Sequence, residues 1–397
     1  MMTYRKLLNL RVRGILSLVV LGLILGVVAQ QGPAQAPPAA KPTPDVVIFR
    51  NGDQLTGTLE RGEGDSVIFK SDLVGEVTIS MDKVKELRSH GSFAVLKKGE
   101  KITRTSKQPG SLTFTDSSVA LSHPGGTVET IPVKDISYVI DGETYDKEVI
   151  GNPGIWVGWK GSIVGGATIV QSTQTGQNYT AGINLVRSIP TVPYLPPRTR
   201  TSFNLIETYG KLTQPTIPQT TPPTADLIIK TNIFHTDFEH DKYLTENMYA
   251  LAGVTYDHNS TQGLSLQQIY GVGLGWTVLK NAAQELDLKT DVHYERQNFD
   301  QTFLPPTPNQ DLIGSTFAET YKRTLPGKLV LTESGTYIQS WNYFQAYSTI
   351  GAVGLALPVY HRFSLSVNAL DNFINNPAFG FKKNSFQFVT GVTYTLP

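Results

Sequence analysis

Residues 285–296 read ELDLKTDVHYER, and polar and apolar side chains alternate along this stretch. Successive side chains of a β-strand point to opposite faces, so the polar and apolar sets separate. The polar face comprises Glu285, Asp287, Lys289, Asp291, His293 and Glu295, and the apolar face comprises Leu286, Leu288, Val292 and Tyr294. The stretch therefore predicts a strand with one wet face and one apolar face.

The same alternation recurs in several other segments, for example at 270–278, 363–369 and 385–396. Alternation alone fits a soluble sandwich equally well, so segment length has to decide. Membrane barrel strands need about 9–11 residues, whereas about 5–6 are usual in globular sheets. The predicted strands are long and number about twelve: 155–171, 177–189, 199–212, 226–238, 244–257, 265–280, 283–298, 312–325, 329–341, 344–359, 362–371 and 384–396.

The connections between these strands alternate in length, as expected for outer-membrane barrels with short periplasmic turns and longer outer loops. Tight turns are predicted at 239–242, 280–282, 325–328 and 360–362. Long polar or Pro-rich loops are predicted at 213–225, 257–264, 299–311 and 372–383. Two connections depart from the rule, because 190–198 is long where a turn is expected and 341–344 is short where a loop is expected.

The chain begins with an export signal. Basic residues at positions 5, 6, 11 and 13 precede the apolar run 14–28, which is too short to span a bilayer comfortably. We predict a signal peptide at 1–36, cleaved after Ala36 in preference to Ala29, and a disordered linker at 37–44. The alternative is an uncleaved signal anchor, and either alternative exports the rest of the chain.

Residues 45–148 contain two tandem copies of one pattern. The segment FRNGDQLTG at 49–57 corresponds to LKKGEKITR at 96–104, and TISMDKVKELR at 78–88 corresponds to TIPVKDISYVI at 130–140. Strand-length apolar runs separated by turn signals such as Asn51-Gly52 predict a small all-β periplasmic domain. The pattern resembles small SH3-like or Sm-like barrels, and we expect the copies to pack together or against the barrel mouth.

Composition excludes several classes of protein. Charged residues are 17%, with 34 Lys and Arg against 33 Asp and Glu, so nucleic acid is not expected as a partner. The absence of Cys excludes disulfides, thiolate metal sites, a Cys nucleophile and a lipidated Cys. No phosphate-binding Gly loop, HExxH motif or dinucleotide fingerprint is present. We therefore expect no cofactor and no bound metal.

The inward charges of the predicted barrel are the candidate functional residues. If the barrel conducts, they select the ions that pass, and the excess of acids predicts a preference for cations. A barrel of this size can instead be filled by its own side chains. The predicted selectors are Glu207, Lys230, Glu285, Asp287, Lys289, Asp291, Glu295 and Glu333.

Two groups could carry other chemistry. His235, Asp237 and Glu239 share one strand face, as do Asp291, His293 and Glu295, and each set could bind a metal or relay protons. We favour the alternative that they pair with one another in a wet interior.

A barrel can also host an enzyme, and the spacing of His258 and Ser260 suits a nucleophile and its base, with Asp257 the nearest acid. The two residues fall in a predicted outer loop, and no orienting acid beyond Asp257 is placed by the sequence. We therefore predict that the protein is not an enzyme, and an outer-membrane lipid hydrolase remains the alternative.

The C-terminal segment resembles the terminal signal that the barrel assembly machinery reads. Thr390, Gly391, Tyr394 and Leu396 follow the order polar, glycine, aromatic, apolar at the required spacing. The chain departs from the signal at Pro397, where an aromatic residue is usual.

Residues 155–397 resemble the YdiY-like family of salt-induced outer-membrane proteins, β-barrels of unknown function. The resemblance rests on WVGWKGSIVGGATIVQSTQTGQNYTAGINL at 156–185, YGVGLGWTVLKN at 270–281 and FKKNSFQFVTGVTYTL at 381–396. NGD-containing repeats ahead of the barrel are a common companion in that family. The resemblance implies an outer-membrane barrel of about twelve strands and supplies no catalytic residues.

The sequence thus predicts an all-β protein: a transmembrane antiparallel barrel of about twelve strands at 155–397, preceded by a small periplasmic β domain. Its expected partners are outer-membrane lipid, the barrel assembly machinery and small solutes. The predicted role is a narrow passive channel or an envelope-structural protein. A soluble periplasmic β-sandwich that binds a ligand is the second alternative.

Overall fold

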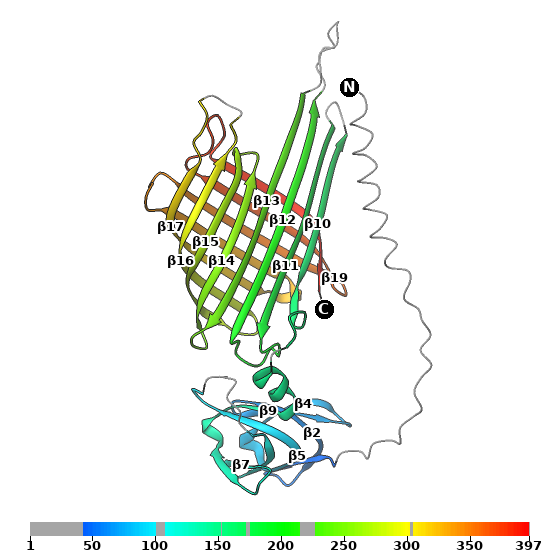
Figure 1. The fold of residues 1–397 in the computed structure, drawn as a ribbon. Helices are drawn as coiled ribbons and strands as arrows, with labels where there is room; N and C mark the ends of the chain where they lie inside the picture. Colours follow the sequence, from blue (N-terminus) through cyan, green and yellow to red (C-terminus); the bar gives the residue numbers. More distant parts are fainter. Residues whose placement is uncertain are drawn as a thin grey trace, which may run out of the picture. The chain divides into compact units, whose positions relative to one another are not determined.

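The computed structural model describes residues 43–100, 108–151, 153–171, 175–214, 227–301 and 305–396. The predicted signal peptide and most of the linker at 37–44 lie outside these residues. Residues Pro44–Pro397 form one compact unit, shown as a ribbon in Figure 1. Among the described residues, no helix has both the length and the apolar character that crossing a membrane requires.

The N-terminal part is one antiparallel sheet in which β4, β3, β2, β1, β5, β6, β7 and β8 lie in that order, while β9 pairs with β2 and β5. The turn between the first two strands is at Asn51-Gly52, where Gly52 has φ +92°. The strands are β1 (Asp45–Phe49), β2 (Gln54–Glu63), β3 (Ser66–Ser71), β4 (Gly75–Ser80), β5 (Val84–Lys97), β6 (Gly110–Thr115), β7 (Ser118–Ser122), β8 (Val128–Pro132) and β9 (Ile136–Asp141).

The two sequence copies occupy corresponding parts of this sheet. In each, a short strand leads through a 3-10 turn, η1 (Met81–Lys83) or η2 (Val133–Asp135), into the last strand of the copy. Buried side chains of both copies, among them Phe69 and Phe114, belong to one hydrophobic core. The copies therefore pack together, because neither could bury enough apolar surface alone. The likeness to SH3-like and Sm-like barrels stays a prediction.

Twelve further strands form a closed barrel in which sequential neighbours pair antiparallel and the last strand returns to the first (Figure 1). This confirms the predicted fold class. The strands are β10 (Trp159–Gln171), β11 (Thr175–Ile189), β12 (Thr199–Gln214), β13 (Leu227–Tyr243), β14 (Met248–Asn259), β15 (Leu264–Lys280), β16 (Gln284–Phe299), β17 (Gln310–Thr324), β18 (Val330–Ser340), β19 (Tyr347–Tyr360), β20 (Phe363–Ile374) and β21 (Asn384–Thr395).

Several predicted boundaries are wrong, and the long loop predicted at 257–264 is only 260–263, because β14 continues to Asn259 and β15 begins at Leu264. The first barrel strand begins at Trp159, not at 155, and the turn predicted at 239–242 lies inside β13. The polar run Glu-His-Asp-Lys suggested a turn, but Glu239 and Asp241 are inward side chains of a strand that continues to Tyr243. The predicted loop at 213–225 falls almost entirely outside the described residues.

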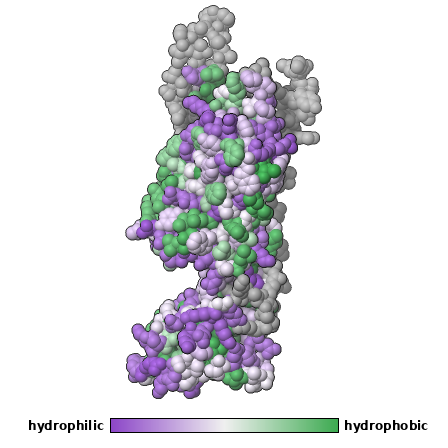
Figure 2. Space-filling model, turned by 90° about the vertical axis from the view of Figure 1, so that its left-hand side faces the viewer, coloured by the Kyte–Doolittle hydropathy of each residue, from purple (hydrophilic) through white to green (hydrophobic). Residues whose placement is uncertain are grey.

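The barrel has an inverted burial pattern. On β16 the outward Leu288 and Val292 are 40% and 50% exposed, whereas the inward Asp287 and Glu295 are 9% and 2% exposed. Figure 2 shows exposed apolar side chains, in green, over the barrel. The barrel thus presents apolar residues to its surroundings and keeps charged residues inside.

The long connection at 190–198 is explained by its contacts with the segment that leads into the barrel. That segment comprises α2 (Gly142–Thr144) and the π-helix η3 (Tyr145–Ile150). Leu195 of the connection is 4% exposed and lies in a cluster with Ile140, Tyr145 and Val149. The Glu148 carboxylate accepts hydrogen bonds from the Thr191 backbone N–H (2.8 Å) and hydroxyl (2.9 Å). The connection is long because it forms a docking surface for this segment.

We predict that Leu195→Ala loosens this docking. Truncating a buried leucine costs about 2–5 kcal/mol, so amide exchange in 142–150 and 190–198 should accelerate. Hydrogen–deuterium exchange with mass spectrometry measures this, and Leu73→Ala is the matched control because Leu73 is 93% exposed. Equal exchange in the two variants would contradict the assignment.

Candidate functional site

An ion-pair network lies on the inner face of β12, β13 and β16. Arg200 Nε lies 2.7 Å from Asp241 Oδ2, and Arg200 Nη1 lies 2.6 Å from Asp287 Oδ2. The guanidinium also lies over the ring of Tyr249, 4.7 Å from its centroid. Asp241 is 1% exposed, and a charge buried to that extent requires a partner. Arg200 therefore bridges two carboxylates from different strands, and its single positive charge balances one of them.

Three more pairs, made by Lys289 and His235, extend the network along β13. Lys289 Nζ lies 2.8 Å and 3.0 Å from the two carboxylate oxygens of Glu239. His235 Nδ1 lies 2.6 Å from Asp257 Oδ1, and His235 Nε2 lies 3.0 Å from Asp237 Oδ1. Each ring nitrogen of His235 thus faces a carboxylate. The charged side chains of these strands thus form ion pairs with one another on the inner face.

A second cluster lies on β16 and its neighbours. His293 Nδ1 lies 2.8 Å from Asp291 Oδ1, which also accepts a hydrogen bond from the Thr316 backbone N–H at 3.0 Å. Glu295 accepts hydrogen bonds from the side-chain amides of Gln267 and Gln297. The described residues contain no group of three His, Asp or Glu side chains arranged to hold a metal ion. The interactions observed here are pairwise hydrogen bonds and ion pairs.

The other strands, β17 to β21, have a mostly neutral inner face, on which the described residues include one charged side chain, Lys322 near the end of β17. The register places small hydroxyl, amide and aliphatic side chains on the inner faces of β17 to β21, and many of them are half-exposed. They include Thr316, Ala318, Ser334, Thr336, Ala352, Asn368 and Gln387. The lumen is therefore asymmetric, with interlocked charges on one wall and small accessible groups on the other.

Five of the eight predicted lumen residues face inward. Ion pairs, hydrogen bonds and strand register place them there: Glu285, Asp287, Lys289, Asp291 and Glu295. Their role as ion selectors stays a prediction.

The placement of Glu207, Lys230 and Glu333 in the lumen is wrong, because all three are exposed on the outer face. The buried inward Thr208 shows that its neighbour Glu207 points outward. Alternate residues of a strand point to opposite faces, so the register of the strand decides the direction of each side chain. The type of a single charged residue does not reveal that direction.

The sequence did not single out Arg200 or Asp241, although these residues organise the network. Asp241 continues the two-residue spacing of His235, Asp237 and Glu239, so that spacing could have identified it. Arg200 is the only charged residue between positions 199 and 206, and its partners lie 41 and 87 residues away. Local pattern carries no signal for such a contact.

Residues 375–383, which we call the cap, connect β20 to β21 at the end of the barrel where the longer connections lie. Ala378 and Phe381 of the cap pack against Leu264 and Phe299. The fully buried Gln262 donates hydrogen bonds from Nε2 to the carbonyl oxygens of Asn372 (3.0 Å), three residues before the cap, and of Lys383 (2.6 Å), its last residue.

The cap connects β20 to β21, whereas Gln262 lies between β14 and β15, six strands away around the ring. The cap therefore reaches across this end of the barrel to pack against β15 and β16.

The structure does not assemble the hydrolase site considered from the sequence. His258 Nδ1 lies 2.8 Å from the carbonyl oxygen of Ser265, and the Ser260 hydroxyl accepts a hydrogen bond from the Asn232 backbone N–H. Asp257 pairs with His235. The candidate nucleophile, base and acid each have a different partner.

The predicted assembly segment lies at the end of β21. Tyr394 points outward and its ring lies 5.0 Å from that of Phe363, and the Leu396 backbone N–H donates to the Gly161 carbonyl at 2.9 Å. Gly391 lies against β10, and Thr390 is exposed. Recognition of this segment by the assembly machinery stays a prediction.

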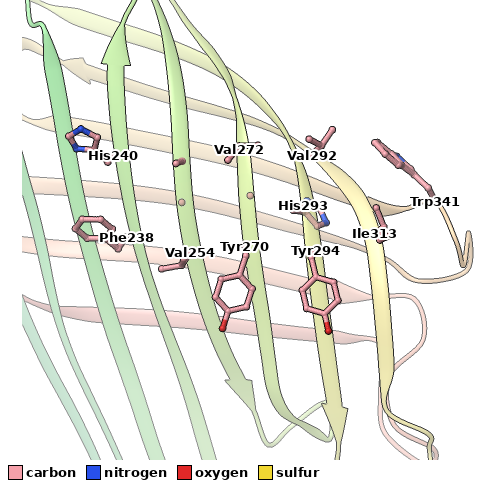
Figure 3. Close-up of a pocket in the computed structure, with 13 residues that line it drawn as sticks. Phe238, His240, Val254, Tyr270, Val272, Val292, His293, Tyr294, Ile313 and Trp341 are labelled. Atoms are coloured by element: carbon pink, nitrogen blue, oxygen red, sulfur yellow. The ribbon is translucent and has the colours of Figure 1, made fainter.

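An apolar hollow of about 750 Å³ lies on the outer surface over β13 to β17 (Figure 3). Gly253 and Gly271 line its floor, and the rings of Phe238, Tyr270 and Tyr294 border it. It faces the surroundings of the barrel, and its lining includes His293 of the second cluster.

Comparison with known proteins gives one family. The model of the family described as "Protein of unknown function, DUF481" matches residues 197–396. No curated protein matches the chain.

Similar solved structures include the NanC porin, at 10% identity, covering 60% of this chain and 100% of that chain with a TM-score of 0.34. They also include the β domain of the Bordetella autotransporter BrkA, at 10% identity, covering 60% of this chain and 98% of that chain with a TM-score of 0.29. The translocator domain of the autotransporter NalP from Neisseria meningitidis matches at 11% identity, covering 59% of this chain and 86% of that chain with a TM-score of 0.29.

We predict that Arg200→Met destabilises the barrel strongly, because it leaves Asp241 and Asp287 buried without their cation. Breaking a buried pair in this way costs about 3–5 kcal/mol. Urea unfolding, followed by the mobility shift of folded barrels on gels, measures the loss. Arg323→Met is the control because Arg323 is exposed, and matching midpoints for the two variants would refute the role of Arg200.

Proposed function

Because the chain belongs to the DUF481 family, whose function is unknown, we propose from the barrel itself that the protein is an integral outer-membrane channel. Its lumen is narrow and prefers cations, and its outer mouth is closed by the cap. The observation that carries the proposal is the inverted burial of β16, with charged side chains inside and apolar side chains outside. The N-terminal sheet then lies in the periplasm.

Membrane insertion accounts for the outer face of the barrel. Exposed outward side chains include Val272, Leu365 and Phe386, at 59%, 53% and 65%. An apolar surface that encircles a barrel far exceeds the few hundred Å² of patch usual for a soluble monomer. Every barrel strand also has at least 11 residues, against the about 9–11 needed to cross a bilayer.

Ion passage is supported by the asymmetric lumen. The half-exposed hydroxyl and amide groups of β17 to β21 leave a polar path beside the charged wall. Acids outnumber bases among the described inward side chains of β12 to β16, so the wall carries a net negative charge. Because Arg200 and Lys289 are already bound to carboxylates, the unpaired excess is acidic.

An envelope-structural role is the second candidate, and the cap favours it. Gln262 and the apolar residues beneath the cap hold the cap in place. A barrel whose cap never opens would not conduct. The two roles are separated by whether releasing the cap produces conductance.

We predict that Glu285→Gln, alone and combined with Asp291→Asn, lowers the preference for cations. One charge about 4 Å from an ion contributes about 1 kcal/mol in water, so the ratio of cation to anion permeability should fall several-fold. Reversal potentials in planar bilayers under a salt gradient measure it. Glu333→Gln removes the same charge from the outer face and should change nothing; an equal effect from both sites would contradict selection in the lumen.

We predict that Gln262→Ala increases the open probability of the channel. The substitution removes the hydrogen bonds that hold both ends of the cap, each worth about 0.5–1.5 kcal/mol. Single-channel recording should show openings at least several times more frequent than in the unsubstituted protein, whereas Gln268→Ala on β15 should behave like that protein. A silent barrel in all three would reject the channel and leave the structural role.

A further inference from the structure

The barrel is closed by a short seam. β10 pairs with β21 only over 162–165 and 392–395, although β10 continues to Gln171 and β21 begins at Asn384. Within the described residues, 384–390 of β21 pair with β20 on one edge and with no strand on the other. Since β21 follows the cap, this unpaired edge lies in the outer half of the barrel.

The backbones of β10 and β21 approach each other closely at three glycines of the seam. A Cβ atom on Gly391 would lie 2.4 Å from the Gly165 carbonyl oxygen, and one on Gly166 would lie 2.6 Å from the Thr390 carbonyl oxygen. Only glycine permits so close an approach of the two backbones. The inner half of the seam is therefore held closely, and these glycine contacts lie directly beyond the last registered pair, Gly165 with Val392.

An unpaired strand edge is unfavourable in hydrocarbon. About half of the residues in a strand direct N–H and C=O groups to each edge, and lipid chains cannot satisfy them. Water can, and the inward Gln387 and Val389 of this segment are half-exposed. The outer half of the seam is thus a place where lumen water and the outer leaflet meet.

The surroundings of this edge are amphipathic. Phe386 and Phe388 point outward and are 65% and 61% exposed. In the ring of twelve strands, β15 and β16 lie opposite the seam, so the charged wall faces it across the lumen. In the proposed channel, the cap closes the outer mouth. A molecule with a polar head and an apolar tail can place its head toward the charged wall and its tail toward the phenylalanines.

We propose that the unpaired outer half of the β10–β21 seam is a lateral portal through which amphiphiles pass between the lumen and the outer leaflet. The inference rests on the proposed membrane insertion. The head group that fits the acidic excess of the lumen is cationic or a hydrogen-bond donor, and the tail is aliphatic.

Lipid contact with the inner side of the seam tests the portal. Because the chain has no Cys, single cysteines at Val389, Thr336 and Phe388 can be labelled with bimane in the full mature chain. The labelled proteins are reconstituted in phosphatidylcholine vesicles with brominated acyl chains, which quench the dye on contact. Val389→Cys should be quenched at least half as strongly as the outward Phe388→Cys, and the inward Thr336→Cys on the closed wall should be unaffected.

Quenching of Val389→Cys no greater than that of Thr336→Cys would overturn the portal while leaving membrane insertion intact. Loss of quenching at Phe388→Cys would instead overturn insertion, and the portal with it. Dodecylamine then tests the class of molecule. It should displace brominated chains and reduce quenching at Val389→Cys about two-fold more than at Phe388→Cys, whereas an equal reduction at both positions would count against amphiphile binding at the seam.

Discussion

The whole barrel depends on one constraint: a backbone surrounded by hydrocarbon must satisfy its own hydrogen bonds. Sequential antiparallel pairing and return of β21 to β10 meet that requirement for most of the ring. The same constraint turns the usual burial pattern around, because apolar side chains then face outward and polar ones inward. The alternation of polar and apolar residues at 285–296 follows from this arrangement.

An interior built in this way has to manage its charges. Carboxylates and bases placed on one wall are stable only when they pair, and Arg200 bridges Asp241 on β13 and Asp287 on β16 for this reason. The paired charges lie on β12 to β16, whereas the inner faces of β17 to β21 carry mostly small, half-exposed side chains. The unequal distribution of charge between the two sides of the lumen is therefore a consequence of satisfying buried charge.

Strand identity and order were predictable because period-two alternation is a local property that each strand repeats. All twelve predicted barrel segments correspond to strands of the structure. The direction of isolated charges was not predictable, as Glu207, Lys230 and Glu333 show, since parity is fixed by buried neighbours such as Thr208. The prediction of a turn at 239–242 was wrong because a strand that faces a polar interior and a turn have similar polar compositions.

The contacts of the cap and of the docking surface at 190–198 could not be predicted from local sequence patterns, because they join residues far apart in the chain. Gln262 binds groups 110 and 121 residues away, and Glu148 binds Thr191 across 43 residues. Contacts of this kind appear in the sequence only as connections of unexpected length. The long turn at 190–198 was such a signal, and it marked a real interaction.

The most direct test of the account is a spin-label scan of β16 in lipid vesicles, with collision rates measured for oxygen and for a water-soluble nickel complex. Single cysteines at Leu288, Val292 and Tyr294 should collide chiefly with oxygen, which concentrates in hydrocarbon. Labels at the inward Lys289 and at Ala318 on the adjacent strand should not. A scan in which the nickel complex reaches the outward positions freely would contradict membrane insertion and the inside-out barrel that follows from it.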